Sequence, residues 1–201
     1  MAKFTIDEIF PVPVFFADIE TTILEETTRL VDDYLASDDW AKTQTTAVFH
    51  TKTTYHSFGN FLSKINADKL TNAIVDASEE FMTRLKMPFP NPFVVQSWLN
   101  INPPMSVHQT HKHYGAMISG TFYIRVPENS GDFVIHDPIE ARRQACVYNK
   151  ISEFNDYNYE FYSYKQPPGR LILFESWVPH TVLPNKSTED RISISFNIGN
   201  T

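Results

Sequence analysis

Two amphipathic helices are predicted in the first half of the chain. Apolar residues recur at helical spacing in residues 20–36 and again in residues 66–86, which is the pattern of a helix with one buried face. Alternate prolines from Pro88 onward end the second helix. Residues 9–19 contain two prolines and are predicted to form an edge strand, because proline cannot donate to a sheet ladder. The polar, threonine-rich residues 41–65 predict a long loop with one short strand.

The second half of the chain changes to a β-rich pattern. Short apolar runs are separated by glycine, proline, asparagine and aspartate. Several short strands at this spacing indicate a sandwich or a barrel. Two helices before a run of strands predict an α+β layout, mainly β, in which the helices cover one sheet. The predicted strands are 93–102, 116–126, 131–136, 158–165, 170–175 and 191–198.

A single domain is expected over residues 1–201. No internal repeat, low-complexity tract or change of composition marks a second domain, and the length is typical of one domain. Within it, residues 1–92 are expected to form an N-terminal strand and a helical support region. Residues 93–199 are expected to form the β-rich core.

The composition excludes several classes of protein. The formal net charge is -7 and no long run of Lys or Arg occurs, so binding to nucleic acid is not expected. No stretch reaches the roughly 20 apolar residues of a membrane span. Cys146 is the only cysteine, which rules out an intramolecular disulfide and a thiolate metal site. A reducing cytoplasm is the expected location.

Three of the seven histidines, His108, His111 and His113, lie within the segment VHQTHKHYG. Residues i and i+2 of an extended strand point to the same face, so His111 and His113 are expected to present two imidazoles to one metal. His108 is three residues from His111 and needs a bulge to join them. It is therefore placed in a loop or outside the ligand shell of the metal. An H-x-H segment is equally compatible with surface histidines in a polar loop.

A second group of residues, near the C-terminus, favours the metal site over surface histidines. The segment PPGRLILFESWVPH ends at His180, and Arg191 then opens the strand RISISFNI. An H-x-H segment followed by a distant histidine and then an arginine resembles the iron(II)/2-oxoglutarate-dependent oxygenases, and the resemblance covers residues 93–199. The phrases QSWLNIN, HKHYGAMISGTFYI and GDFVIHDP are similar to a branch of prolyl-hydroxylase-like oxygenases found in bacteria and their phages.

The resemblance implies a double-stranded β-helix (jelly-roll) core with the N-terminal helices packed on one sheet. It also implies one iron(II) ion with His111, His113 and His180 as ligands. Iron(II) oxygenases commonly use two histidines and a carboxylate, yet no histidine in this chain is followed two residues later by an acid. Three ligand sets stay open: three histidines, two histidines with water, or two histidines with a remote acid. The candidate remote acids are Asp132, Asp137 and Glu175.

The resemblance further implies 2-oxoglutarate as cosubstrate and O₂ as oxidant. Arg191 is expected to bind the distal carboxylate, because a guanidinium donates two parallel hydrogen bonds to a carboxylate. Ser193 shares the strand face of Arg191, and Tyr123 matches a tyrosine that the prolyl-hydroxylase branch uses on the same carboxylate. Asn100 and Asn102 are expected to bind the carboxylate nearer the metal. The alternatives are a core tyrosine and asparagines that cap strand ends.

The expected activity is that of an iron(II)- and 2-oxoglutarate-dependent oxygenase that hydroxylates a small molecule or a protein side chain. One alternative is a three-histidine cupin-type dioxygenase without 2-oxoglutarate, which needs no buried cation; Arg191 then pairs in solvent with Glu189 or Asp190. The other is a non-catalytic β-helix domain that binds a partner. Specificity is expected in loops 41–65 and 139–157, and a homodimer is compatible with the sequence.

The histidine assignment predicts the metal content of two variants. His111→Ala and His180→Ala are each expected to lower the bound iron(II) sharply, because each removes one of few ligands. Far-UV circular dichroism should stay close to that of the wild type. Metal analysis of the purified proteins measures the effect, and full metal occupancy in His180→Ala contradicts the assignment.

Overall fold

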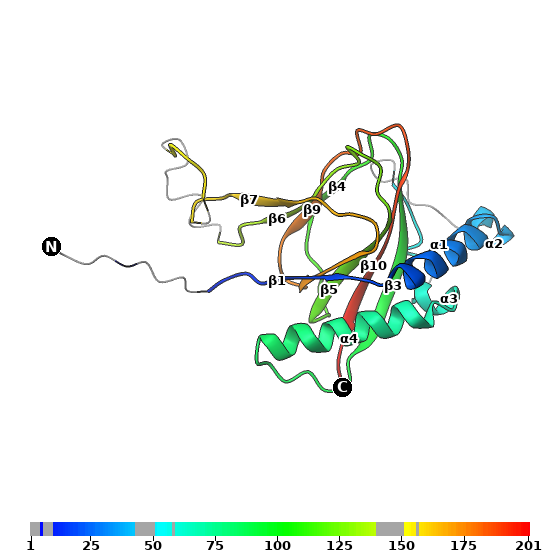
Figure 1. Ribbon diagram of the computed structural model, residues 1–201, viewed down its shortest axis with the longest axis horizontal. Helices are drawn as coiled ribbons and strands as arrows, with labels where there is room; N and C mark the ends of the chain where they lie inside the picture. The colour runs from blue at the N-terminus through cyan, green and yellow to red at the C-terminus, as the bar shows by residue number, and fades with distance from the viewer. Residues whose placement is uncertain (1–4, 6–9, 43–50, 58, 140–150, 156) are drawn as a thin grey trace.

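Figure 1 shows the computed structural model of the chain, a β-rich body with helices on one side. The structure describes residues 5, 10–42, 51–57, 59–139, 151–155 and 157–201. Cys146, His50 and large parts of the two expected specificity loops lie outside the described residues. The elements in chain order are β1 (Val14–Asp18), α1 (Thr21–Leu35), α2 (Asp38–Lys42), β2 (Lys52–Thr53), α3 (Phe61–Lys64), α4 (Asp68–Arg84), β3 (Phe93–Asn102), β4 (His108–His111), β5 (Ile118–Arg125), β6 (Phe133–His136), β7 (Phe161–Tyr164), β8 (Arg170–Glu175), β9 (His180–Val182) and β10 (Arg191–Gly199).

The strands of the described residues form two antiparallel sheets. The larger sheet has the order β1-β8-β5-β10-β3-β2, and the smaller sheet has the order β4-β9-β6-β7. Apart from the pairs β2–β3 and β6–β7, neighbouring strands are not consecutive in the sequence, as in a jelly roll, and the two sheets do not close into a barrel (Figure 1). The predicted double-stranded β-helix with N-terminal helices on one sheet is confirmed.

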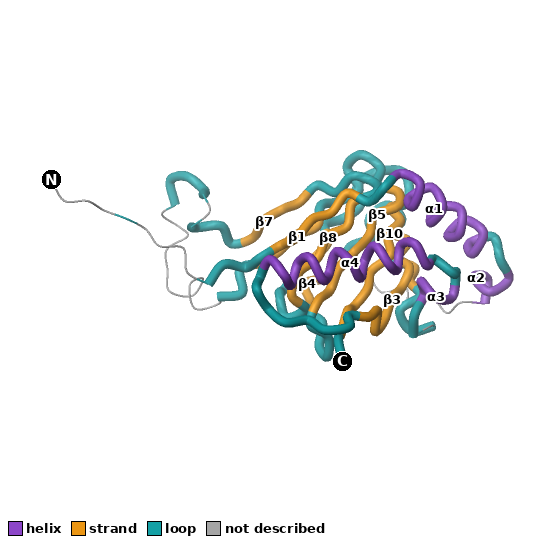
Figure 2. Tube along the Cα trace, turned by 60° about the horizontal axis from the view of Figure 1, so that its bottom comes forward, coloured by secondary structure: helices purple, strands orange, loops and turns teal. Residues whose placement is uncertain are grey.

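Helices α1 and α4 cover the outer face of the larger sheet (Figure 2). Leu70, Ile74 and Phe81 of α4 lie in one apolar core with Ile194 and Phe196 of β10. Each such side chain contributes roughly 1.5–3 kcal/mol when it is fully buried, so this layer fixes the sheet against the helices. Both predicted long helices are confirmed. No helix among the described residues has both the length and the apolar character that crossing a membrane requires.

Strand β10 divides the apolar layer from the interior between the sheets. Its outward residues Ile192, Ile194 and Phe196 belong to the core under the helices. Its inward residues Arg191 and Ser193 line a cavity between the two sheets. The alternation of RISISFNI along one strand therefore separates packing from polar chemistry, as the period of two predicts.

Two short features differ from the sequence expectation. The segment 41–65, predicted as a loop with one short strand, contains β2 but also α3 and the end of α2. Phe61 and Leu62 of α3 are fully buried, so tertiary packing creates a single helical turn that has no periodic signal in the sequence. His180, which lies outside the predicted strands, begins strand β9. A three-residue strand is too short to show alternation.

The packing of α4 on the sheet predicts a stability difference between two alanine variants of the same helix. Ile74→Ala is expected to cost about 2–5 kcal/mol, because it leaves a cavity in a fully buried layer. Glu79→Ala, on the exposed face of α4, is expected to change stability by less than about 0.5 kcal/mol. Urea unfolding measures both. Equal losses in the two variants would show that α4 does not pack in this way.

Candidate active site

Two of the predicted metal ligands, His111 and His180, face each other across neighbouring strands. They are paired directly in the register of β4 and β9, and their ring centroids lie 4.2 Å apart. His111 ends β4 and is exposed, whereas His180 begins β9 and is buried. Strand pairing thus brings together two histidines that are distant in the sequence.

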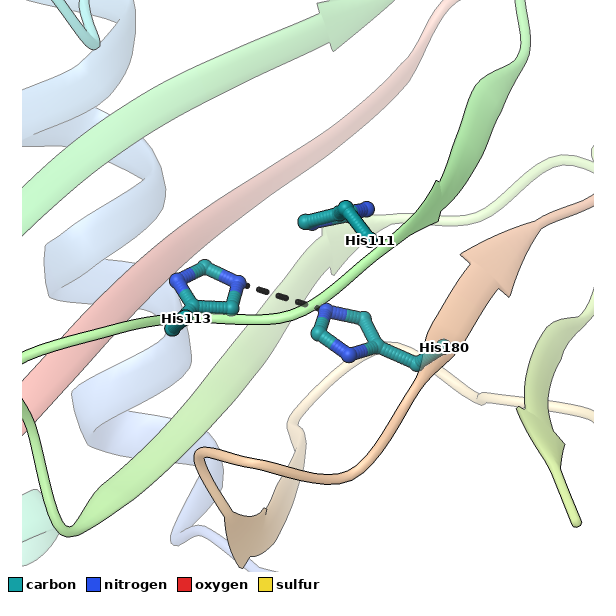
Figure 3. A group of neighbouring side chains, drawn as sticks. All are labelled: His111, His113 and His180. Atoms are coloured by element: carbon teal, nitrogen blue, oxygen red, sulfur yellow. Dashed lines mark hydrogen bonds between the residues drawn. The ribbon is translucent and has the colours of Figure 1, made fainter. Parts of the chain in front are cut away.

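His113 completes the cluster from a position beyond the end of β4. This corrects the expectation that it shares a strand with His111. The chain leaves the sheet because the backbone N–H of His113 donates to the carbonyl of Ser176, at 2.9 Å, in the turn after β8. Nε2 of His113 lies 3.3 Å from Nε2 of His180 (Figure 3). The potential ligand atoms of the three histidines lie within 4.8 Å of one another.

Backbone carbonyls orient two of the imidazoles. Nδ1 of His111 donates to the carbonyl of Gln109 at 2.7 Å, and Nδ1 of His180 donates to the carbonyl of Val178 at 2.9 Å. These contacts place the proton on Nδ1 and leave the lone pair on Nε2. Burial, assisted by the neighbouring His111, lowers the pKa of His180 to about 2 and the pKa of His113 to about 4. Both rings are therefore neutral at pH 7, the form that binds a metal.

The third imidazole is oriented by ring stacking. No described residue hydrogen-bonds to Nδ1 of His113. The indole of Trp98 on β3 stacks on His113 at 5.6 Å with an interplanar angle of 21°. The ring of His180 is nearly parallel to that of His113, with an interplanar angle of 9° and ring centroids 5.1 Å apart. Trp98 therefore holds the plane of the His113 ring.

No carboxylate joins this cluster within the described part of the chain. The three histidines are the one group of neighbouring potential metal ligands among the described residues. Asp132, Asp137 and Glu175 are all described, and none of them belongs to that group. Imidazole nitrogen is a suitable donor for iron(II). The donor set therefore fits iron(II) without a protein carboxylate.

His108 lies in the wall of the same cavity, outside the metal group. The pairing of β4 with β9 shifts register between His108 and His111, which is the irregularity that their spacing requires. Nδ2 of Asn102 lies 2.7 Å from Nε2 of His108. Burial lowers the pKa of His108 to about 3, and the charge of Arg191 adds to this effect. Neutral His108 therefore accepts this hydrogen bond and positions Asn102.

Arg191 is fully buried, and no carboxylate of a described residue pairs with it. Its exposed fraction is 1%. Nη1 donates to the carbonyls of Ser130 at 2.7 Å and Gly131 at 3.0 Å, while Nε has no hydrogen-bond partner among the described residues. Burial lowers the pKa of Arg191 below its ordinary value. Neither Glu189 nor Asp190 pairs with it, so the guanidinium is a buried cation that is costly unless an anion meets it.

The loop that holds Arg191 requires a glycine. Gly131 has a φ of +93°, and a Cβ atom there would lie 2.1 Å from the carbonyl oxygen of Leu183. Only glycine adopts this backbone conformation without strain at such a close approach. The two carbonyls that accept from Arg191 are thus fixed between β5 and β6.

The predicted cosubstrate-binding residues lie side by side on the inner face of the larger sheet. In the register of β10, Arg191 pairs with Asn102, and Ser193 pairs with Asn100 on one side and Tyr123 on the other. All five line one cavity. The side-chain oxygen of Asn102 is buried without a partner. Burial raises the pKa of Tyr123 to about 12, so its phenol stays protonated and donates.

The cavity has a narrow inner part and a wider outer part. The inner cavity, of about 40 Å³, reaches Arg191 and includes the apolar side chains Phe133 and Phe174. The outer groove, of about 500 Å³, lies toward β2 and the segment after β4. The residues common to both are Trp98, Asn100, His108, His111 and His113. The histidine cluster therefore separates a deep polar cavity from an open groove.

Several cavity residues were not singled out in the sequence. Trp98 precedes Asn100 and Asn102 by an even number of positions on β3, and Thr121 precedes Tyr123 in the same way on β5. Both line the inner cavity. Strand alternation was the signal that would have found them. The stacking of Trp98 on His113 depends on the tertiary structure and has no signal in the sequence.

These features together define an iron(II)- and 2-oxoglutarate-dependent oxygenase. The family model described as "Putative 2OG-Fe(II) oxygenase" matches residues 96–197, about half of the chain, and the chain belongs to this family. Among curated proteins, no sequence matches this chain. The match spans the histidine cluster and the polar inner face of the larger sheet.

The solved structures that share this fold include the following three. A prolyl-4-hydroxylase from Pseudomonas putida is 13% identical, with a TM-score of 0.62 and coverage of 94% of each chain. EctD from S. alaskensis, solved with 2-oxoglutarate and 5-hydroxyectoine, is 12% identical, with a TM-score of 0.64 and coverage of 94% of this chain and 72% of that one. HygX from Streptomyces hygroscopicus, solved with nickel, 2-oxoglutarate and hygromycin B, is 10% identical, with a TM-score of 0.59 and coverage of 94% and 84%. At such low identities, the structural similarity shows a shared fold and nothing more.

The stacking of Trp98 on His113 predicts a change in metal affinity. Trp98→Ala is expected to weaken iron(II) binding by about tenfold, the scale on which residues around metal ligands act, because the His113 ring loses the surface that orients it. Trp98→Phe retains a flat ring and is expected to stay within a few-fold of the wild type. Anaerobic titration against a competing chelator measures both affinities. Unchanged affinity in a folded Trp98→Ala protein contradicts this role.

Proposed function

We propose that the protein hydroxylates an organic substrate, with His111, His113 and His180 as the iron ligands and Arg191 as the anchor of 2-oxoglutarate. One observation carries this proposal. A fully buried guanidinium without a carboxylate partner opens onto the same cavity as the histidine cluster. A dianionic cosubstrate that bridges the metal and Arg191 would supply the anion that this cation lacks.

The cavity wall fits the two ends of such a cosubstrate. At the far end, Arg191 with a free Nε, the Ser193 hydroxyl and the protonated Tyr123 phenol offer donors to the distal carboxylate. Charge-assisted bonds of this kind are about twice as strong as neutral ones. Nearer the histidines, Asn100 and Asn102 present amide groups to the end that faces the metal. Since the inner cavity is narrow, its side chains must move apart when the cosubstrate enters.

Iron(II) and 2-oxoglutarate together supply O₂-dependent oxidation of a substrate C–H bond, with release of succinate and CO₂. The protein's own residues bind and orient these groups. The three imidazoles would offer nitrogen lone pairs, the carbonyls of Gln109 and Val178 accept hydrogen bonds from two of the rings, and Phe133 and Phe174 form an apolar part of the cavity wall. The histidine cluster would hold the metal where the inner cavity meets the outer groove.

The cupin-type alternative is less well supported, because a dioxygenase that uses no 2-oxoglutarate has no need of a buried cation. Succinate formation tests this directly. The protein with iron(II) is expected to convert 2-oxoglutarate to succinate, and the same protein without metal is not. Absence of succinate with iron(II), together with O₂ consumption in the absence of 2-oxoglutarate, would favour the cupin-type activity.

We further propose a cytoplasmic location, supported by the single cysteine in the sequence. Within the family, the substrate is a small molecule or a side chain of a protein. The outer groove adjoining the histidines is the place where such a substrate would reach the metal.

Arg191 predicts a specific loss of cosubstrate affinity. Arg191→Ala is expected to weaken 2-oxoglutarate binding by roughly 2–5 kcal/mol, the cost of removing one partner of a buried charge pair, while iron(II) still binds. Anaerobic titration of the iron-loaded protein, followed by the metal-to-ligand charge-transfer band, measures the affinity. Arg125→Ala removes an exposed arginine that pairs with Asp32 and should leave the affinity unchanged. Equal affinity in the Arg191 variant and the wild type contradicts the proposal.

A further inference from the structure

The described residues that line the outer groove include a positive charge but no negative one. The groove lies between the β2–β3 side of the larger sheet and the segment that follows β4. Among the described residues that line it, Lys112 is the only Lys, Arg, Asp or Glu, although the chain as a whole has a net charge of -7. Lys112 is exposed, and no described residue forms an ion pair or hydrogen bond with it. In the part of the chain that the structure describes, the groove therefore presents a cation without an opposing carboxylate.

The proposed iron site adds positive charge to the same groove. A carboxylate ligand would cancel one charge of iron(II), whereas the three imidazoles are neutral ligands. Arg191 is a second fixed cation, and the cosubstrate dianion cannot cancel the metal, Arg191 and Lys112 together. The loaded site therefore keeps a positive field at the groove, and low-dielectric walls strengthen such a field. This step rests on the proposed function, whereas the position of Lys112 does not.

Aromatic rings form the rest of the recognition surface. Tyr55 lies edge-on to Trp98, with ring centroids 4.9 Å apart and an interplanar angle of 84°. Tyr114 is 90% exposed and follows Lys112 by two residues along the lining segment. Exposed tyrosine rings gain favourable contact area when a flat ligand covers them. The side-chain amides of Gln96 and Asn197 add neutral hydrogen-bonding groups to the groove lining.

We propose that the outer groove selects a small substrate that carries both a planar ring and an anionic group. The ring packs against Tyr55 and Tyr114, and the anion pairs with Lys112. This arrangement would hold the part of the substrate between them next to His111 and His113. A cationic substrate would meet Lys112 and the metal with like charge, so discrimination by charge is built into the groove.

Three probes of one shape and different charge test this selection. They are 3-phenylpropanoate (anion), 3-phenylpropanol (neutral) and 3-phenylpropylamine (cation). Each is titrated calorimetrically into anaerobic protein saturated with iron(II) and 2-oxoglutarate, so that the cosubstrate already fills the Arg191 end. The anion is expected to bind about tenfold more tightly than the alcohol, with the amine weakest, and added salt should reduce the preference.

Charge reversal at Lys112 locates the effect. Lys112→Glu is expected to weaken binding of the anion by about tenfold or more and to strengthen binding of the amine. Lys186→Glu changes the net charge equally at an exposed lysine outside the groove lining and should alter neither affinity. Equal affinities of the three probes in the wild type, no binding of any probe, or the same response in both variants would overturn the inference.

The charge-transfer band separates this result from the proposed function. A normal 2-oxoglutarate band without any charge preference among the probes overturns the groove inference alone. A missing band in the wild type overturns the proposed function. Because Lys112 carries its charge without the metal, the comparison of Lys112→Glu with Lys186→Glu on metal-free protein decides the role of Lys112 in that case as well.

Discussion

A guanidinium buried without a carboxylate is the constraint on which the rest of this structure depends. The desolvation of Arg191 costs several kcal/mol, and two backbone carbonyls offset only part of that cost. The strand that carries it is held in place from its other face, where Ile192, Ile194 and Phe196 pack beneath the helices. The helical layer therefore stabilises the strand and leaves its inner face free for polar groups. One face of β10 packs in the core, and the other face carries the polar residues of the site.

The periodic elements of the fold could be predicted from the sequence, and the short ones could not. The long helices and β10 show their periods over enough residues to define both faces, so the inward position of Arg191 follows from RISISFNI alone. Strands β4 and β9 have four and three residues, too few for a pattern. The spacing of His111 and His113 predicted that both side chains lie on one face of a strand, but β4 ends at His111. Three features depend on tertiary contacts: the pairing of His111 with His180, the register shift that separates His108 from His111 on β4, and the stacking of Trp98 on His113.

A cluster of three histidines without a carboxylate changes the electrostatics of the site. Neutral imidazoles leave the full charge of a divalent metal uncompensated, so anionic ligands become more favourable on both sides of the cluster. In the proposed site, this charge would act on the inner side with Arg191 on the cosubstrate. On the outer side it would act with Lys112 on the substrate in the groove. The third ring, His113, is oriented by stacking on Trp98 and by the backbone contact with Ser176, so its geometry depends on β3 and on the turn after β8.

The most direct test of this account is a crystal structure of the protein with iron(II) and 2-oxoglutarate, grown without oxygen. The account predicts a metal bonded to Nε2 of His111, His113 and His180, with the distal carboxylate of 2-oxoglutarate on Arg191. A carboxylate oxygen of Asp132, Asp137 or Glu175 in the place of His113 would contradict the three-histidine centre. A cosubstrate bound away from Arg191 would contradict the role of the buried cation.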